Sequence, residues 1–153
     1  MSARGIPVAG EPKGMDVSDL ANHIDHTVLR PDARRADIER ACRVARELGC
    51  AGVCLNPIHV ALASSLLKGS SVKVVAVIGF PFGATYTAVK SLETEAAVRD
   101  GADELDTVLA IGALKDREFD VVEADIEAVV RRASRCGLRE DVDRLSWLRR
   151  DGA

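Results

Sequence analysis

Three polar side chains interrupt short apolar segments of this sequence and could do chemistry there. Asp25, Cys54 and Asp106 each lie within such a segment. A carboxylate placed in an apolar strand costs several kcal/mol unless it is partnered, so Asp106 is a candidate for proton transfer, and Asp25 could face the same interior cavity. The alternative for Asp106 is a structural carboxylate bound to a lysine or a backbone amide, and for Asp25 it is a capping or packing role. The residue types leave both alternatives open.

The cysteine and histidine residues near these segments predict neither a thiol nucleophile nor a metal site. Cys54 has no evident base, because His59 lies five residues further on in an expected helix; a small buried apolar side chain is the favoured interpretation. His23 and His26 are three residues apart but straddle a helix-to-strand boundary, and no third ligand is near. We therefore expect no metal site.

Apolar runs and glycine positions predict four alternating strand and helix units. Strands are expected at 24–29, 52–55, 72–82 and 105–111. Helices are expected at about 16–22, from a cap at Asp32 to Leu48, at 57–67, at 87–100 and from about Phe119. The helix at 87–100 has one apolar face, formed by Val89, Leu92, Ala96 and Ala97. Gly49 is placed to end the second of these helices. The order predicts an α/β fold with parallel strands, and periodicity alone does not separate an open sheet from a barrel. The glycine-rich loop 79–85 has no dinucleotide or Walker pattern, so a turn explains it.

Composition excludes several classes of partner. The 153 residues carry a net charge of −3 and only three Phe, one Tyr and one Trp, which argues against nucleic-acid binding. No apolar run approaches the roughly 18 to 20 residues that a membrane span needs. The segment 1–14 is rich in Gly and Pro, has no signal-peptide pattern and is expected to be a flexible tail. The cysteines form no CxxC pair and are interpreted as free thiols in a reducing cytoplasm: Cys42, Cys50, Cys54 and Cys136.

Five motifs occur in order and together resemble one family. They are Ile-Asp-His-Thr-Val-Leu-Arg-Pro at 24–31, Gly-Val-Cys-Leu-Asn-Pro at 52–57, Val-Ile-Gly-Phe-Pro-Phe-Gly at 77–83, Gly-Ala-Asp-Glu-Leu-Asp at 101–106 and Ile-Gly-Ala-Leu-Lys at 111–115. Each motif is weak alone, but the series resembles the deoxyribose-phosphate aldolases over about residues 16–132. The resemblance implies a (β/α)₈ TIM-type barrel, here represented by about four of its eight units.

The resemblance also implies a reaction and roles for particular residues. The family is a class I aldolase that cleaves 2-deoxy-D-ribose 5-phosphate to D-glyceraldehyde 3-phosphate and acetaldehyde through a lysine Schiff base, without a cofactor. Asp106 matches the family's proton-relay aspartate. Asp25 resembles the first-strand carboxylate, and Cys54 resembles the cysteine beside the substrate. Ala110 departs from the pattern, because relatives often carry a polar residue there.

None of the five lysines matches the reactive lysine, which the family carries on its sixth strand. Lys68 and Lys90 fall in expected outer helices, Lys73 enters its strand at the N-terminal end, Lys115 belongs to the fourth-strand motif, and Lys13 is in the tail. An iminium is the electron sink for this cleavage, so the chain is expected to be inactive alone. The alternative is a non-catalytic α/β fragment that binds a partner or a sugar phosphate.

The last part of the sequence does not resemble a barrel unit. Seven arginines fall between Arg131 and Arg150, where a fifth strand should be apolar. We therefore divide the chain into a tail at 1–14, a partial aldolase barrel at 15–135 and an atypical Arg-rich tail at 136–153. That last tail is interpreted either as a frameshift product or as a short amphipathic helix. Four strands cannot close a barrel, so the open edges predict poor solubility or a homodimer.

Overall fold

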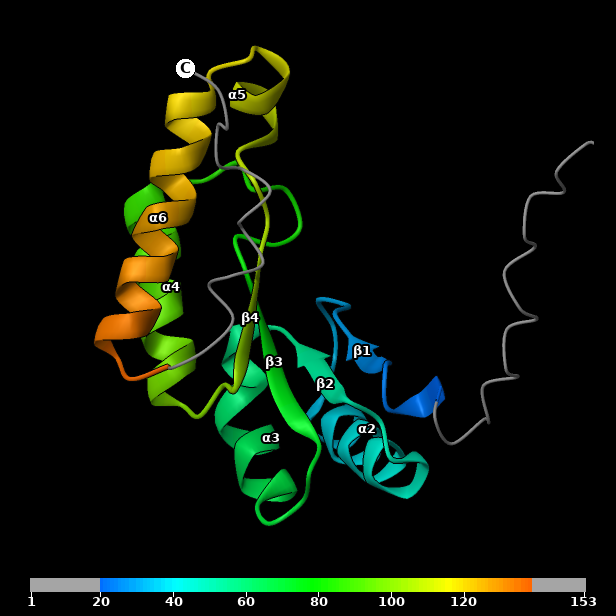
Figure 1. The fold of residues 1–153 in the computed structure, drawn as a ribbon. Coiled ribbons are helices and arrows are strands. Elements are labelled where there is room, and N and C mark those ends of the chain that lie inside the picture. The colour runs from blue at the N-terminus through cyan, green and yellow to red at the C-terminus, as the bar shows by residue number, and fades with distance from the viewer. Residues whose placement is uncertain (1–19, 139–153) are drawn as a thin grey trace, which may run out of the picture.

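A parallel four-stranded sheet with helices in alternation forms the fold in the computed structural model, which describes residues 20–138. The strands lie in the order β1-β2-β3-β4 (Figure 1) and span Asp25–Val28, Gly52–Leu55, Lys73–Ile78 and Glu104–Thr107. The helices that follow them are α2 (Arg35–Leu48), η1 (Pro57–His59) with α3 (Val60–Leu67), α4 (Thr87–Arg99), and α5 (Ile111–Lys115) with α6 (Phe119–Arg135). The predicted α/β fold with parallel strands is confirmed.

The two faces of the sheet have different compositions. Residues that pair across parallel strands share a face, and the register aligns Val53 with Val74 and Ala76 with Leu105. This face packs against the helices and holds the main apolar core, which includes Ile38, Ala41, Ala45, Val53, Leu55, Val60, Val74, Ala76 and Ile78. The opposite face has a much smaller buried cluster of Cys54, Val75 and Val77. The fold is therefore stabilised mainly from the helix-covered side.

Two of the predicted strands are too long. β3 ends at Ile78 because Gly79 has a φ of 68°, which only glycine adopts without strain and which leaves the extended conformation. β4 ends at Thr107, and Ile111 begins the short helix α5. The Val108 amide still donates to the Ile78 carbonyl at 2.9 Å, but no ladder continues beyond it. The prediction of strand at 108–111 was therefore wrong.

The helix ends follow the sequence only in part. Gly49 is left-handed at the end of α2, as predicted. Asp32 is not the cap, because α2 begins at Arg35 and the Asp37 carboxylate accepts the Arg34 amide at 2.9 Å instead. Most of the helix expected at 16–22, the tail 1–14 and most of the Arg-rich tail lie outside the described residues.

The face of α4 that meets the sheet differs from the prediction. Val89 and Leu92 were expected to lie on a buried apolar stripe, but both are exposed. The buried positions of this helix are Lys90, Thr94 and Ala97. The prediction failed because polar groups on this helix find buried partners, which apolar periodicity cannot register.

Within residues 20–138, no helix has the length and apolar character needed to cross a bilayer.

Candidate functional site

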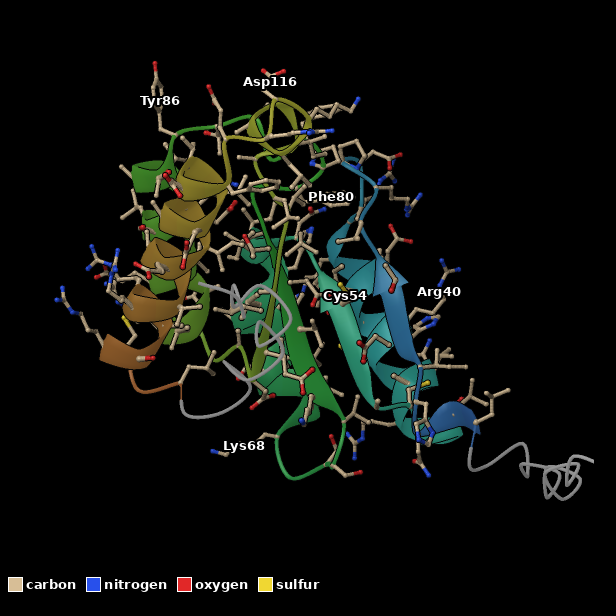
Figure 2. The ribbon with its side chains drawn as sticks, turned by 45° about the horizontal axis from the view of Figure 1, so that its top comes forward. Arg40, Cys54, Lys68, Phe80, Tyr86 and Asp116 are labelled. Atoms are coloured by element: carbon tan, nitrogen blue, oxygen red, sulfur yellow. The ribbon has the colours of Figure 1, made fainter. Side chains whose placement is uncertain are left out.

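The structure places Asp25, Cys54 and Asp106 on one face of the sheet, opposite the helix-covered core. Asp25 pairs in register with Gly52, which lies two residues before Cys54 on β2. Cys54 pairs with Val75, and Val77, two residues further along β3, pairs with Asp106. The three side chains therefore form a diagonal that rises toward the C-terminal ends of the strands. Cys54 lies in the middle of the sheet (Figure 2).

Cys54 and Asp106 approach each other across an intervening strand. The Cys54 Sγ lies 4.0 Å from Asp106 Oδ2, although strands separated by one neighbour lie ~9.5 Å apart in a flat sheet. Both side chains therefore lean over β3 on a sheet that curves toward this face. A thiol is a weak donor, so this contact is a weak hydrogen bond between the two side chains.

Asp106 is exposed, which corrects one step of the sequence argument. The apolar segment around it indicated a buried carboxylate, but its side chain faces the open side of the edge strand β4 while Leu105 packs on the core. An exposed carboxylate has no burial cost that a partner must offset. Candidacy for proton transfer therefore depends on its position at the strand end and not on the energetics of burial.

The Cys54 thiol is held in its protonated form. Burial, and after it the negative charges of Asp106 and Asp25, together raise its pKa to about 11. The thiolate is the nucleophilic form of cysteine, so this environment disfavours a nucleophile. The side chain is buried beside Val75 and Val77.

Asp25 lies against the backbone of the neighbouring strand. A Cβ atom at Gly52 would come within 2.5 Å of Asp25 Oδ1, so the absence of a side chain at Gly52 makes room for the carboxylate. Asp25 is exposed on β1 and is one same-face position below Cys54. Both carboxylates thus act on the same thiol from strands on either side of it.

The histidine near β1 and the glycine-rich loop after β3 form neither a metal site nor a phosphate site in the described residues. His26 lines a hollow on the β1 edge, and among the described residues no cluster of His, Cys, Asp or Glu has the geometry of a metal site. In the loop after β3, the Gly79 amide is bound by Glu93 Oε2 at 2.7 Å and the Gly83 amide by the Gly79 carbonyl at 2.8 Å. Both amides already have partners within the loop, which fits a turn better than a phosphate cradle.

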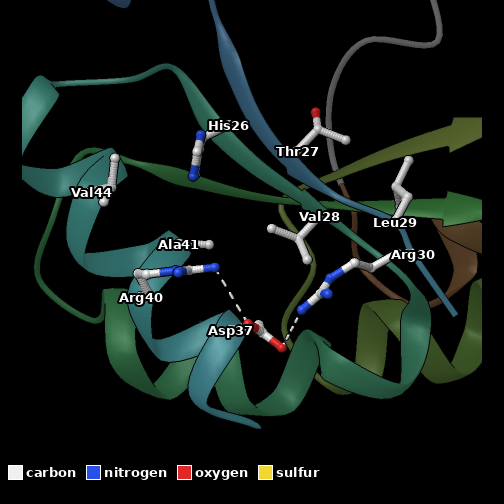
Figure 3. A pocket seen from close by; sticks show the side chains of 9 residues that line it. All are labelled: His26, Thr27, Val28, Leu29, Arg30, Asp37, Arg40, Ala41 and Val44. Atoms are coloured by element: carbon white, nitrogen blue, oxygen red, sulfur yellow. Dashed lines mark hydrogen bonds and ion pairs between the residues drawn. The ribbon is translucent and has the colours of Figure 1, made fainter. Parts of the chain in front are cut away.

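A hollow at the β1 edge has neither Asp25 nor Asp106 in its lining. It has a volume of about 490 Å³ and lies between β1 and α2 (Figure 3). Asp37 pairs there with Arg30 and Arg40. The Arg34 amide lowers the pKa of the Asp37 carboxyl, and Arg30 and Arg40 lower it further. An ion-paired edge of this kind supports helix α2 and presents no acid–base pair.

Sequence reasoning missed a buried ion pair between two helices. Lys90 was assigned to an outer helix, yet its side chain is fully buried and its Nζ lies 2.5 Å from Asp125 Oδ2. Two signals were available. Lys90 lies four residues before Thr94 and seven before Ala97, which puts the three on one face of α4. Asp125 falls inside the apolar stripe of α6, beside Ile126.

The fold and site define a class of protein: a parallel (β/α) sheet with two carboxylates on one face, of which Asp106 lies near the C-terminal ends of the strands, where α/β proteins place their functional groups. Solved aldolases share this fold. The tetrameric deoxyribose phosphate aldolase from Aeropyrum pernix superposes with a TM-score of 0.70 at 32% identity, over 80% of this chain and 50% of that one. The aldolase QR15 gives 0.72 at 41% identity, over 76% and 52%.

Residues 20–139 match the model of the DeoC/LacD family aldolases, and the chain belongs to this family. The deoxyribose-phosphate aldolase of Clostridium perfringens is 52% identical over 124 residues, which are 81% of this chain and 55% of that protein. The deoxyribose-phosphate aldolase of Aciduliprofundum boonei is 47% identical over 128 residues, 84% and 58% respectively. The chain thus spans just over half the length of these relatives.

Proposed function

We propose that this chain supplies the first four (β/α) units of a TIM-type barrel lyase that cleaves 2-deoxy-D-ribose 5-phosphate to D-glyceraldehyde 3-phosphate and acetaldehyde through a lysine Schiff base. The observation that carries the proposal is the diagonal of Asp25, Cys54 and Asp106 on one face of the sheet, in a chain of the DeoC/LacD family. Relatives that carry the name deoxyribose-phosphate aldolase support the substrate.

Asp106 is the proton-relay residue of this proposal. A general acid or base must be within reach of the substrate and free to change its charge. Asp106 is exposed at the end of β4, and its neighbour Cys54 is a thiol whose raised pKa keeps it neutral. In this proposal, Asp25 and Cys54 lie on the same face of the sheet as Asp106 and line the substrate site with it. The sugar phosphate is the only ligand required, with no metal or organic cofactor.

The amine of the Schiff base must come from residues beyond these four units. Lys90 is buried in an ion pair, and Lys73 pairs with Glu104 at the N-terminal end of the sheet at 2.5 Å. Lys68 is exposed at the end of α3, and Lys115 is exposed at the end of the short helix α5 that follows β4. Acid–base work supplies ~10² to 10⁴-fold, and enzymes reach ~10⁶-fold or more. We therefore propose that this chain is inactive alone.

The open strands β1 and β4 give the expected mode of assembly. Each ends the sheet in the described part of the chain, and an exposed edge offers unpaired backbone groups to another strand. We propose that a second half-barrel, either a second copy of this chain in a homodimer or the complementary half of a relative, pairs with these edges. The free thiols Cys42, Cys50 and Cys54 support a reducing cytoplasm as the location.

Trapping with borohydride tests the proposal. The chain is incubated with acetaldehyde and borohydride, alone and with the C-terminal half of the Clostridium perfringens relative, and adducts are located by mass spectrometry. We expect no adduct on the chain alone, and with the added half an adduct on that half together with cleavage of deoxyribose 5-phosphate. Asp106→Asn should then lower turnover by about 10² to 10⁴-fold, whereas the exposed Lys68→Gln should not.

Two outcomes would contradict the proposal. An adduct on a lysine of this chain would show that its own amine is reactive. Binding of the complementary half without turnover would favour the non-catalytic alternative, in which the fragment binds a partner or a sugar phosphate.

A further inference from the structure

A buried polar cluster joins helices α4 and α6 behind the C-terminal ends of β3 and β4. Lys90 is fully buried, and its Nζ donates to Asp125 Oδ2 at 2.5 Å and to the Val108 carbonyl at 2.8 Å. The Thr87 hydroxyl donates to the other Asp125 oxygen at 2.7 Å. Asp125 therefore has a partner on each oxygen, and the ammonium has two acceptors. We call Lys90 and Asp125 the clamp.

The clamp also holds the turn after β3. A Cβ atom at Gly79 would lie 2.8 Å from Lys90 Cε, so the lysine stem passes directly over this glycine. Glu93, one turn further along α4, accepts the Gly79 amide at 2.7 Å. Helix α4 thus contacts the β3 turn with its lysine stem and with its glutamate.

Val108 connects the clamp to the candidate site. It lies two residues after Asp106, its carbonyl accepts Lys90 Nζ, and its amide donates to the Ile78 carbonyl at 2.9 Å. The chain leaving β4 is therefore fixed by β3 on one side and by the clamp on the other. Together, the two hydrogen bonds of Val108 fix the backbone at the end of β4 and so set the direction of the side chains there, including that of Asp106.

Burial of this ion pair is not explained by stability alone. Removing two charges from water costs about as much as their attraction returns, and apolar residues of similar size often serve as well. The clamp differs from such a replacement because it bonds one specific carbonyl, that of Val108. An apolar pair would fill the space without fixing the position of that carbonyl.

We propose that Lys90 and Asp125 are positioning residues that hold the end of β4 so that the Asp106 carboxylate lies against Cys54. Both belong to helices that pack on the helix-covered side of the sheet, where Ala97 of α4 and Val129 of α6 join the core, whereas Asp106 is on the opposite face. The proposal depends on the proposed function only for the chemical use of Asp106. The position of Asp106 can be measured without any enzymatic activity.

The Cys54 thiol reports that position. Its pKa is raised to about 11 by burial and, to a smaller extent, by two charged groups, Asp106 on β4 and Asp25 on β1. Carbon-13 labelling of the cysteine Cβ allows the thiol to be titrated by NMR in the full chain, with circular dichroism confirming the fold at each pH. Four proteins form the core of the experiment: the parent, Asp106→Asn, K90M/D125L and the combination of all three substitutions.

In the parent, Asp106→Asn should lower the pKa of Cys54 by removing a nearby negative charge. K90M/D125L leaves no unpaired charge and should also lower it, because Asp106 is no longer held at the thiol. In that background, Asp106→Asn should have less than about a third of its effect in the parent, because residues that act through one contact are not additive. Asp25→Asn, on a strand away from the clamp, should act equally in both backgrounds, and Lys68→Met should change nothing.

Three results would overturn the proposal. Asp106→Asn could keep its full effect in K90M/D125L, which would show that the clamp does not set the carboxylate. The effect of Asp25→Asn could shrink as well, which would indicate general loosening around Cys54. If K90M/D125L does not fold, Glu93→Gln replaces it. That substitution weakens the hold on Gly79 without burying a charge, and an unchanged Asp106→Asn effect in its background would reject the role of α4.

Discussion

The two faces of the sheet differ in what they contribute. The helix-covered face holds nearly all of the large buried side chains, including Ile38, Leu55 and Ile78, and it also holds the Lys90–Asp125 pair. The opposite face holds two exposed carboxylates and a small buried cluster around Cys54. The free energy of folding is therefore concentrated on the first face, and the groups suited to chemistry lie on the second.

This separation has a physical reason. In (β/α) barrels, parallel strands bury one face under their own helices and turn the other face toward the barrel interior. A group on the second face can change without disturbing the core. The clamp is the exception that links the two faces, because it is buried on the helix side and bonded to the segment that follows Asp106.

The largest effect on stability should come from removing one member of the clamp. Lys90→Met leaves the Asp125 carboxylate buried without its cation, which should lower the free energy of unfolding by about 3–5 kcal/mol. Urea denaturation followed by circular dichroism measures it. The paired substitution K90M/D125L should recover most of the loss. If it is as unstable as Lys90→Met, the uncompensated charge is not the cause.

A core substitution on the helix-covered face should be next in size. Leu55 is fully buried on β2, and Leu55→Ala should cost about 2–5 kcal/mol through lost burial and the cavity that remains. Thr27→Ala, on the opposite face of β1, is the matched control and should change stability by less than about 0.5 kcal/mol. Equal losses at the two positions would contradict the contrast between the faces.

The Cys54 thiol should make stability depend on alkaline pH. Its folded pKa of about 11 lies above the ordinary value of 9.0, so between these values the folded chain keeps a proton that the unfolded chain has lost. Stability should therefore fall as the pH rises through this window. Burial also raises the pKa of the Cys42 thiol, so Cys54→Val should reduce the slope without abolishing it, as measured by urea midpoints at several pH values. Cys136→Ser, at an exposed thiol, should leave the slope unchanged.

The smallest effect should be found at the edge hollow beside β1. The Arg34 amide lowers the pKa of Asp37 from 3.8, so its contribution to stability is present above that value and is lost as the pH falls through the lower folded pKa. Asp37→Asn should slightly lower the melting temperature at neutral pH, with the difference from the parent shrinking in acid. A difference that stays constant down to acid pH would show that the charge is not the cause. Asp32→Asn, which is not the cap, should have less effect.

The sequence was sufficient for the order of the elements and for the candidate residues. Continuous apolar runs predicted four strands that the structure shows, and Gly49 marked the end of α2. The motif series led to the family that the comparisons identify. These features are local, because strand and helix periodicity and glycine conformation are set by neighbours in the chain. The roles of Asp25, Cys54 and Asp106 remain predictions.

Local patterns failed where distant segments meet. The end of β4 at Thr107, the exposure of Asp106 and the buried side of α4 all depend on which elements pack together. Apolar periodicity selected Val89 and Leu92 for the core, whereas Lys90 is the residue that is buried. A lysine becomes a core residue only when an acid from another helix arrives beside it, and Asp125 is 35 residues away.

By itself, the sequence determined a parallel α/β chain of the aldolase family and three residues worth testing, because strand formation and motif spacing are written in consecutive residues. Only the tertiary structure decided that Cys54 and Asp106 lie 4.0 Å apart and that Lys90 and Asp125 pair behind the strand that carries Asp106. Both contacts join residues separated by tens of positions, and the curvature of the sheet and the packing of its helices bring such residues together.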